Sequence, residues 1–307
     1  MSLFLAVLLS FAAGEVQASN TIKFVSYNVE NLHDTEHDEG KDDWEYLPLN
    51  HPGKAEACEK VRSPYYRKLC KETDWTDKKL TIKLKQIEKA VLAASGGVVP
   101  DLLALSEVEN RKVVEMLAER LGMTQVYVTE SPDERGMDVA LVLNLKKGMS
   151  VAAHRELAVA GIDKPTRNVL EVKVKLPGNH FLYVYVNHWP SQAAPAFTRV
   201  AAARTVSEAI AEKRKQEPSA AFLVVGDFNV TPEDRPDPFD SIFLSQKELA
   251  LMDLNTEYRK LMLRKKNYPA LNSMPPGSYF FSVEMTWNLL DRVFFSRNLV
   301  DDAGVEI

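Results

Sequence analysis

Hydrophobic and polar positions follow two periods along this chain, and together they predict a mixed α/β fold. Continuous or alternating apolar runs predict strands at residues 21–27, 101–105, 125–128, 137–143, 168–176, 181–186 and 222–225. Apolar residues at a helical spacing and one alanine-rich stretch predict helices at residues 78–94, 111–121, 199–215 and near 257–265. Because strands and helices are interspersed without clean alternation, the pattern favours an α/β domain with mixed sheets.

A polar segment from Asp34 to Asp77 interrupts this pattern after the first strand. We expect a long insert on the surface, and loops of this length are usually functional. Cys58 and Cys70 lie within it, and we expect them to form a disulfide, because a loop without its own core gains from such a link in an oxidising compartment. In the chain-entropy model this link contributes about 3 kcal/mol. The absence of a paired histidine motif argues against zinc.

The N-terminal segment has the pattern of an export signal. Its apolar run from Leu3 to Ala13 is too short to span a bilayer as a helix, and small residues around Ala18 suit a signal peptidase. We therefore expect residues 1–18 to be a signal peptide and the mature protein, which begins near residue 21, to be secreted or periplasmic. No other stretch approaches the length of a membrane span.

Composition bounds the partners. The chain has 307 residues, 45% of them hydrophobic and 26% charged, which is ordinary for a globular domain. A net charge of -5 argues against holding nucleic acid by bulk electrostatics. It is compatible with an enzyme that grips a phosphodiester locally through a metal ion and a few basic side chains. No obligate protein partner is indicated.

Polar side chains follow the apolar run from Phe222 to Val225, where Gly226 turns the chain out of the sheet. Asp227 and Asn229 stand two positions apart, so an extended chain would project a carboxylate and a carboxamide to the same side. Such a pair can orient a water molecule or a phosphate oxygen beside a metal ion. The alternative is an ordinary Asx turn at the strand end.

Three other apolar strands also end in polar groups suited to metal and phosphate. These groups are Asn28 with Glu30, Glu107, and Asn187 with His188. Each alone has a structural explanation, such as a helix cap for Glu107. Four such strand ends are harder to explain by capping, and their oxygen-rich set favours Mg²⁺ or Mn²⁺ over zinc.

Six segments of this chain, taken in their order, are specific as a combination: VSYNVENL, LLALSEVEN, RGMDVALV, VNHWPSQ, VVGDFNVTP and WNLLDRVFFS. In this order they resemble the endonuclease/exonuclease/phosphatase superfamily, which includes deoxyribonuclease I-like enzymes, apurinic endonucleases, sphingomyelinases and inositol polyphosphate phosphatases. The resemblance covers the chain from about Ile22 to Ser296. It implies a four-layer αββα sandwich of two mixed sheets flanked by helices, and metal-dependent hydrolysis of a phosphoester.

The resemblance also implies roles for single residues. Glu107 would be the principal metal ligand, with Asn28 and Glu30 near the same ion. Asp227 would orient or deprotonate the attacking water, so that the metal polarises the phosphoryl group while the protein positions the nucleophile.

The remaining implied roles concern the phosphate and the pocket. Asn229 would hold the phosphate, and His188 would hydrogen-bond a phosphoryl oxygen as negative charge builds up in the transition state. The other residues that the resemblance places at the site are Arg135, Asp138, Asn187 and Asp291.

The chain departs from the family pattern at its end. Family members end the active site with a Ser-Asp-His motif whose histidine pairs with the aspartate that stands here as Asp291. Here Arg292 follows, and the sequence stops at Ile307 before such a motif. Either the sequence is a fragment of a longer protein or this is a natural variant. Because loss of such a group costs roughly 10² to 10⁴ in rate, we expect weak or no activity from these 307 residues alone.

The leading hypothesis is an exported, Mg²⁺-dependent phosphodiesterase that acts on nucleic acid. The alternatives are a phosphatase or lipid phosphodiesterase of the same superfamily, and a non-catalytic binding protein on that scaffold. We further expect the insert from Asp34 to Asp77 to cover one side of the cleft and to set substrate choice, because it follows Glu30 so closely.

Overall fold

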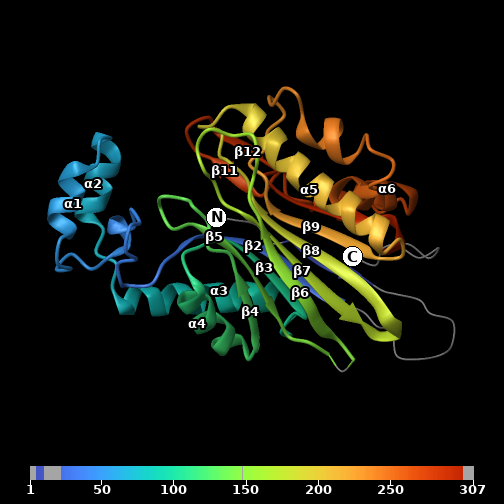
Figure 1. The fold of residues 1–307 in the computed structure, drawn as a ribbon, viewed down its shortest axis with the longest axis horizontal. Coiled ribbons are helices and arrows are strands. Elements are labelled where there is room, and N and C mark those ends of the chain that lie inside the picture. The colour runs from blue at the N-terminus through green and yellow to red at the C-terminus, as the bar shows by residue number, and fades with distance from the viewer. Residues whose placement is uncertain (1–4, 10–21, 147, 300–307) are drawn as a thin grey trace.

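Two stacked β-sheets form the centre of the protein in the computed structural model, which describes residues 5–9, 22–146 and 148–299 (Figure 1). The five-stranded sheet has the order β1 (Leu5–Leu9), β2 (Ile22–Leu32), β3 (Leu102–Val108), β5 (Asp138–Leu143), β4 (Gln125–Val128). The six-stranded sheet has the order β10 (Leu251–Asp253), β13 (Asp291–Ser296), β9 (Ala221–Asp227), β8 (His180–His188), β7 (Val169–Leu176), β6 (Ser150–Leu157). Both sheets mix parallel and antiparallel pairs.

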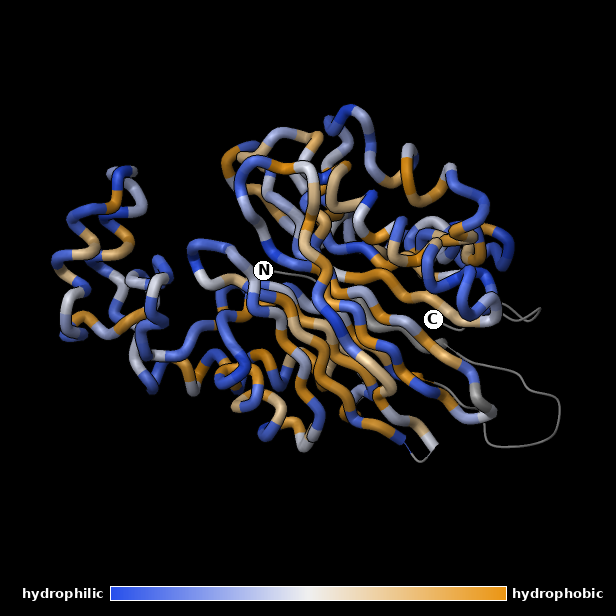
Figure 2. Tube along the Cα trace, viewed as in Figure 1, coloured by the Kyte–Doolittle hydropathy of each residue, from blue (hydrophilic) through white to orange (hydrophobic). Residues whose placement is uncertain are grey.

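Helices cover the outer faces of both sheets, so the architecture is the predicted four-layer sandwich. Helices α3 (Asp77–Ala94) and α4 (Arg111–Leu121) share an apolar core with the five-stranded sheet. Helix α5 (Ala196–Gln216) and the helical turn Phe239–Phe243 share another with the six-stranded sheet. A third core, with Leu141, Val184 and Leu223, fills the space between the sheets. Figure 2 shows apolar residues running along the strands, as burial on both faces requires.

Two further helices lie after β9. Helix α6 (Leu254–Arg264) follows β10 and contacts β13, and the short helix α7 (Tyr268–Asn272) packs against α6. Strands β11 (Tyr279–Phe281) and β12 (Thr286–Asn288) then form a separate hairpin that leads into β13.

Six strands of the structure are not among the seven predicted from the sequence, namely β1, β6, β10, β11, β12 and β13. Strand β6 carries His154, Arg155 and Glu156 in a largely exposed run, so it lacks the apolar period on which a prediction depends. Strand β10 is three residues long, and β11 lies in a segment for which no strand was predicted. The predicted helices and the other predicted strands occur within a few residues of their expected bounds, except that β2, β3 and β8 run on into their polar ends.

The insert is more ordered than a loop. It contains a 3₁₀ turn (Trp44–Tyr46) and a helical hairpin of α1 (Lys54–Lys60) and α2 (Pro64–Glu72), which projects to one side in Figure 1. The expected disulfide between Cys58 and Cys70 joins the two helices, with the Cα atoms 5.5 Å apart. The buried Lys54 ammonium donates to the carbonyl oxygens of Glu45, Leu47 and Thr73 at 3.1, 2.5 and 2.7 Å. A disulfide and one multiply bonded lysine therefore replace a large core here.

Part of the predicted export signal is outside the described residues, including the expected cleavage position after Ala18. Within it, β1 pairs antiparallel with β2 from Leu5 opposite Ser26 to Leu9 opposite Ile22. Among the helices that the structure describes, none combines the length and the apolar character needed to cross a bilayer.

We predict that the double substitution Cys58→Ser and Cys70→Ser loosens the hairpin without unfolding the sandwich. Loss of the link should remove about 3 kcal/mol of local stability, since the hairpin shares none of the three apolar cores. Trypsin should then cut faster at Lys60 or Arg67, while the main thermal transition stays in place. A matching loss in the main transition would contradict this independence.

Candidate active site

The predicted polar residues meet where strands from both sheets end. In the six-stranded sheet, His188 lies opposite Asp227 on parallel strands, and Asp227 lies opposite Asp291 on antiparallel ones. The two sheets touch here, since the Ser106 hydroxyl donates to the Asn187 carbonyl oxygen at 3.2 Å. Residues distant in sequence therefore share one end of the sandwich.

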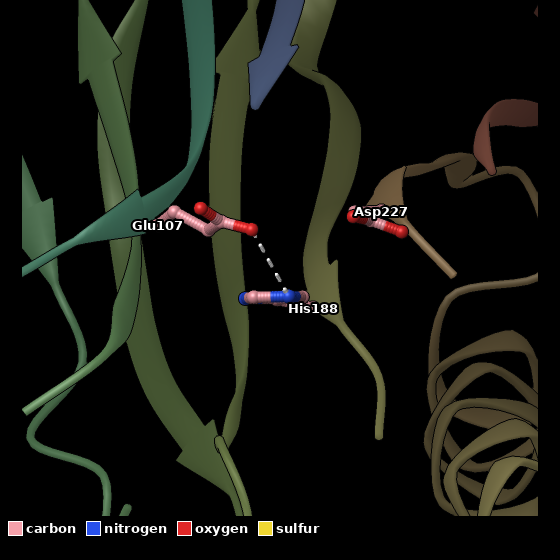
Figure 3. A group of neighbouring side chains, drawn as sticks. All are labelled: Glu107, His188 and Asp227. Atoms are coloured by element: carbon pink, nitrogen blue, oxygen red, sulfur yellow. Dashed lines mark ion pairs between the residues drawn. The ribbon is translucent and has the colours of Figure 1, made fainter. Parts of the chain in front are cut away.

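Glu107, His188 and Asp227 form the centre of the cluster. One ligand atom from each lies within 4.8 Å of the others. Figure 3 shows Glu107 and His188 pointing toward one another, with 3.8 Å between His188 Nε2 and Glu107 Oε1, and Asp227 beside them. The Asn28 carboxamide donates to Glu107 Oε1 and to Asp227 Oδ2, both at 2.9 Å. A single amide thus links a carboxylate from each sheet.

Irregular backbone at the strand ends aims these side chains. Glu107 (φ 63°) and Asn229 (φ 51°) adopt left-handed conformations, which cost about 1 to 3 kcal/mol each for non-glycine residues. Glu107 stands at a bulge where the pairing of β3 with β5 shifts. Gly226 has φ 125°, and a Cβ there would lie 2.0 Å from the Asn187 carbonyl oxygen, so no other residue fits.

Backbone amides complete the hold on the two central carboxylates. The Asn31 N–H donates to Glu107 Oε2 at 3.0 Å, and the Asn229 N–H donates to Asp227 Oδ1 at 2.8 Å. Asn31 and its neighbour Glu30 are both left-handed (φ 63° and 57°), which forms a bulge after Asn28. The ammonium of Lys83, on α3, donates to the Glu30 carbonyl oxygen at 2.5 Å and fixes this bulge from outside.

The carboxylates of Glu107, Asp227 and Asp291 repel one another, with little positive charge nearby to offset the repulsion. Burial, and then the neighbouring Glu107, raise the pKa of Asp227 to about 6. Burial and the adjacent Asp227 raise the pKa of Asp291 well above its usual range, and its buried Oδ1 has no hydrogen-bond partner. Oxygen-rich, mutually repelling groups of this kind suit a hard divalent cation, which would relieve the repulsion. The residues present therefore fit the metal that the sequence predicted.

His188 is a neutral imidazole at this site. Burial holds the pKa of His188 well below its usual range, and the positive charges of Arg167 and Arg135 lower it further. Its Nδ1 atom is buried without a hydrogen-bond partner. A neutral ring can donate one hydrogen bond to a substrate or offer one lone pair to a metal.

Arg167 is a buried positioning residue that the sequence gave no means of finding. Its guanidinium donates to the carbonyl oxygens of His188 (3.2 Å) and Trp189 (2.6 Å) and pairs with Asp133 at 3.3 Å. It therefore fixes the chain at the end of β8, directly after His188. A lone arginine before an apolar strand has no pattern that marks it.

Some predicted site residues lie apart from the cluster. The Asn187 side chain is fully buried, where it donates to Tyr185 and Val225 carbonyl oxygens and accepts from the Trp189 indole. Its amide is therefore used within the sheet and does not reach a substrate.

Asp138 and Glu30 also serve other purposes. Asp138 accepts from the hydroxyls of Thr129 and Ser131, and burial raises its pKa to about 6. It therefore stabilises a turn rather than lining the pocket. Glu30 is exposed, and the structure places its backbone rather than its carboxylate in contact with the site.

Three further residues frame the site. The Asn229 amide donates to the Trp189 carbonyl oxygen at 3.1 Å, and Arg135 is exposed at the rim. Arg292 points away and pairs with Asp253 at 2.8 Å, in keeping with the expectation that it does not replace a histidine. The Ser278 hydroxyl, which the sequence did not single out, accepts the Asp291 N–H at 2.9 Å.

Comparison with known proteins gives the class. The model of an endonuclease/exonuclease/phosphatase family matches residues 23–306, so the chain belongs to this family. This membership makes it a phosphoester hydrolase by family, and the cluster of Glu107, His188 and Asp227 gives it a candidate site for the divalent metal on which such enzymes generally depend. No curated protein matches the sequence.

Solved structures share the fold at low sequence identity. An endonuclease/exonuclease/phosphatase family protein from Bacteroides thetaiotaomicron is 13% identical, with a TM-score of 0.52 over 95% of this chain and 84% of that one. The human Nocturnin catalytic domain, solved with a bound sulfate anion, is 17% identical, with a TM-score of 0.52 over 70% of this chain and 74% of that one. These likenesses concern the fold.

We predict that Asp291→Asn stabilises the metal-free protein. Burial and the adjacent Asp227 raise the pKa of Asp291 well above its usual range, so the folded protein binds a proton that the unfolded chain does not, and stability falls as the pH rises through this window. The buried Oδ1 of Asp291 has no hydrogen-bond partner, so an amide NH2 fits in its place. In EDTA at pH 7.5 the variant should melt about 2 to 4 °C higher than the native protein, and the two should converge near pH 4. The exposed Asp240→Asn serves as control, and a lower melting temperature for Asp291→Asn would contradict the repulsion.

We also predict that Arg167→Met destabilises the protein by about 3 kcal/mol, because it removes the buried partner of Asp133 and the donor to the His188 and Trp189 carbonyl oxygens. Chemical denaturation measures this loss. The double variant Arg167→Met with Asp133→Asn should recover part of it. Equal losses in the single and double variants would show that the pairing does not matter.

Proposed function

We propose that the protein is an exported, Mg²⁺-dependent phosphodiesterase that acts on nucleic acid. The observation that carries this proposal is the joining of Glu107 and Asp227, one from each sheet, through the Asn28 amide beside a neutral His188. A protein without catalytic activity has no need to bury these two mutually repelling carboxylates. Its retention supports an enzyme over a non-catalytic binding protein.

The residues have distinct tasks in this proposal. Glu107 and Asp227 would hold the divalent ion, which when bound supplies positive charge to the phosphoryl group. Asp227 would also orient the attacking water and accept its proton, since its carboxylate is held in place by the Asn28 amide and the Asn229 N–H. His188 would donate a hydrogen bond to a phosphoryl oxygen. Asn229 lies near it, since the Asn229 amide donates to the carbonyl oxygen of Trp189, the next residue along the chain, which also accepts from Arg167.

The disulfide in the insert and the predicted signal peptide support export. The choice of nucleic acid rests on family membership together with the cation Arg135 at the rim. Magnesium is proposed because the carboxylates present hard oxygen donors.

A lipid phosphodiesterase is the second candidate, and one observation favours it. The hairpin of β11 and β12 exposes Val283 by 81% and Met285 by 73%, and its base is tied to Asp291 through Ser278. Apolar residues at such a tip suit a membrane-borne substrate. The exposed Glu284 between them weakens this fit.

The test is hydrolysis of supercoiled plasmid DNA, of bis-p-nitrophenyl phosphate and of phospholipid vesicles, each with Mg²⁺, Mn²⁺ or EDTA. In keeping with the weak activity expected from the sequence, we expect slow cleavage of the first two, its loss in EDTA, and a further loss of at least about 10²-fold in Asp227→Asn and Glu107→Gln. Asp240→Asn should behave like the native protein. Cleavage of vesicles alone would show that the substrate is a lipid and not nucleic acid. Cleavage in EDTA would contradict the proposed metal-dependent mechanism.

A further inference from the structure

The first part of the insert is fixed to the rim of the active site. The Lys41 ammonium donates to the carbonyl oxygens of Ser131 and Asp133, both at 3.0 Å, and the Asp42 N–H donates to the Glu134 carbonyl oxygen at 2.7 Å. These acceptors belong to the loop that carries Arg135. The segment that leads into the 3₁₀ turn Trp44–Tyr46 is therefore held against the loop that carries Arg135.

The ring of Tyr46 has a fixed position within this segment. It stacks on His33, with centroids 4.1 Å apart and planes 7° apart, and meets the Trp75 ring edge-on at 6.1 Å. His33 in turn bonds Glu109 at 3.0 Å. Glu109 follows Glu107 by two residues, so the stack is anchored to the strand end that supplies the metal-side carboxylate.

The hydroxyl of Tyr46 lies in the electrostatic field of the site. Burial comes first in raising its pKa, followed by the negative charges of Glu45 and Glu107, while Arg135 acts in the opposite direction. It forms no hydrogen bond within the part of the chain that the structure describes. It is therefore a protonated hydroxyl whose charged neighbours include the Glu107 carboxylate and the Arg135 guanidinium.

We propose that Tyr46 is a substrate-binding residue whose hydroxyl donates a hydrogen bond to a non-bridging oxygen of the bound phosphodiester, on the side where Arg135 lies. This inference rests on the proposed function and assigns the insert a part in it. Because the ring is held by stacking before substrate arrives, little side-chain entropy is lost on binding. The donor is neutral, so it adds affinity for the diester without opposing the metal ion.

A purely structural role for Tyr46 gives a different pattern in variants. Tyr46→Phe keeps the ring and its stacking on His33 but removes the hydroxyl. Under the proposal, the KM for bis-p-nitrophenyl phosphate rises about tenfold, as expected for a lost hydrogen bond to a charged group. kcat stays within about twofold and the melting temperature is unchanged, because the lost interaction is equal in the ground and transition states.

Direct binding supplies a second readout. A fluorescein-labelled phosphorothioate oligonucleotide, which resists cleavage, is titrated with each protein and followed by anisotropy. We expect Tyr46→Phe to bind several-fold more weakly than the native protein. Tyr268→Phe is the matched control, since Tyr268 is 56% exposed on α7.

The outcomes separate this inference from the proposed function. The native protein turns over the diester if the proposed function holds. If Tyr46→Phe then shows an unchanged KM and unchanged oligonucleotide binding, the role of the hydroxyl is overturned and the phosphodiesterase activity is not. A fall in melting temperature with a matching loss of kcat also overturns it, since that pattern belongs to a structural residue. If the native protein hydrolyses neither phosphodiester, the proposed function fails, and the anisotropy measurement alone decides on Tyr46.

Discussion

The carboxamide of Asn28 is the connection on which the site depends. Its two N–H donors go to Glu107 in one sheet and to Asp227 in the other. Each carboxylate would otherwise face a like charge in a poorly solvated space, where the repulsion is strong. The amide satisfies one oxygen of each acid and fixes the distance between the two strand ends that carry them.

Holding this arrangement costs stability. Glu107, Asn229 and the Glu30–Asn31 bulge adopt left-handed conformations, and Asp291 and His188 keep buried polar atoms without partners. These features persist because three apolar cores, between and outside the sheets, stabilise the strands that lead to them. Arg167 and Lys83 add support from behind by bonding the backbone on either side of the cluster.

The insert combines two structures with different relations to the site. In its base, Tyr46 stacks on His33, which bonds Glu109 just after β3, and Lys41 bonds the loop at residues 131–136. Its helical hairpin is held by a disulfide and by Lys54, outside the three main apolar cores. A rigid base and an independently stabilised hairpin allow the chain to add surface near the site without changing the sandwich.

The resemblance of six segments to a known family implied the four-layer arrangement. The sequence by itself determined the α/β class with mixed sheets, the disulfide and the strand ends that carry Glu107, His188 and Asp227. These follow from local signals: an apolar period, two cysteines in one insert, and polar residues directly after apolar runs. Tertiary structure decided which of those polar residues face one another. Asn187 and Asp138 stand in the same motifs as the site residues, yet bulges and pairing direct their side chains into the protein. Arg167, Lys83, Ser278 and Tyr46 carry no local signal, because each acts through a partner that is distant along the chain and becomes a neighbour only when the sheets pack.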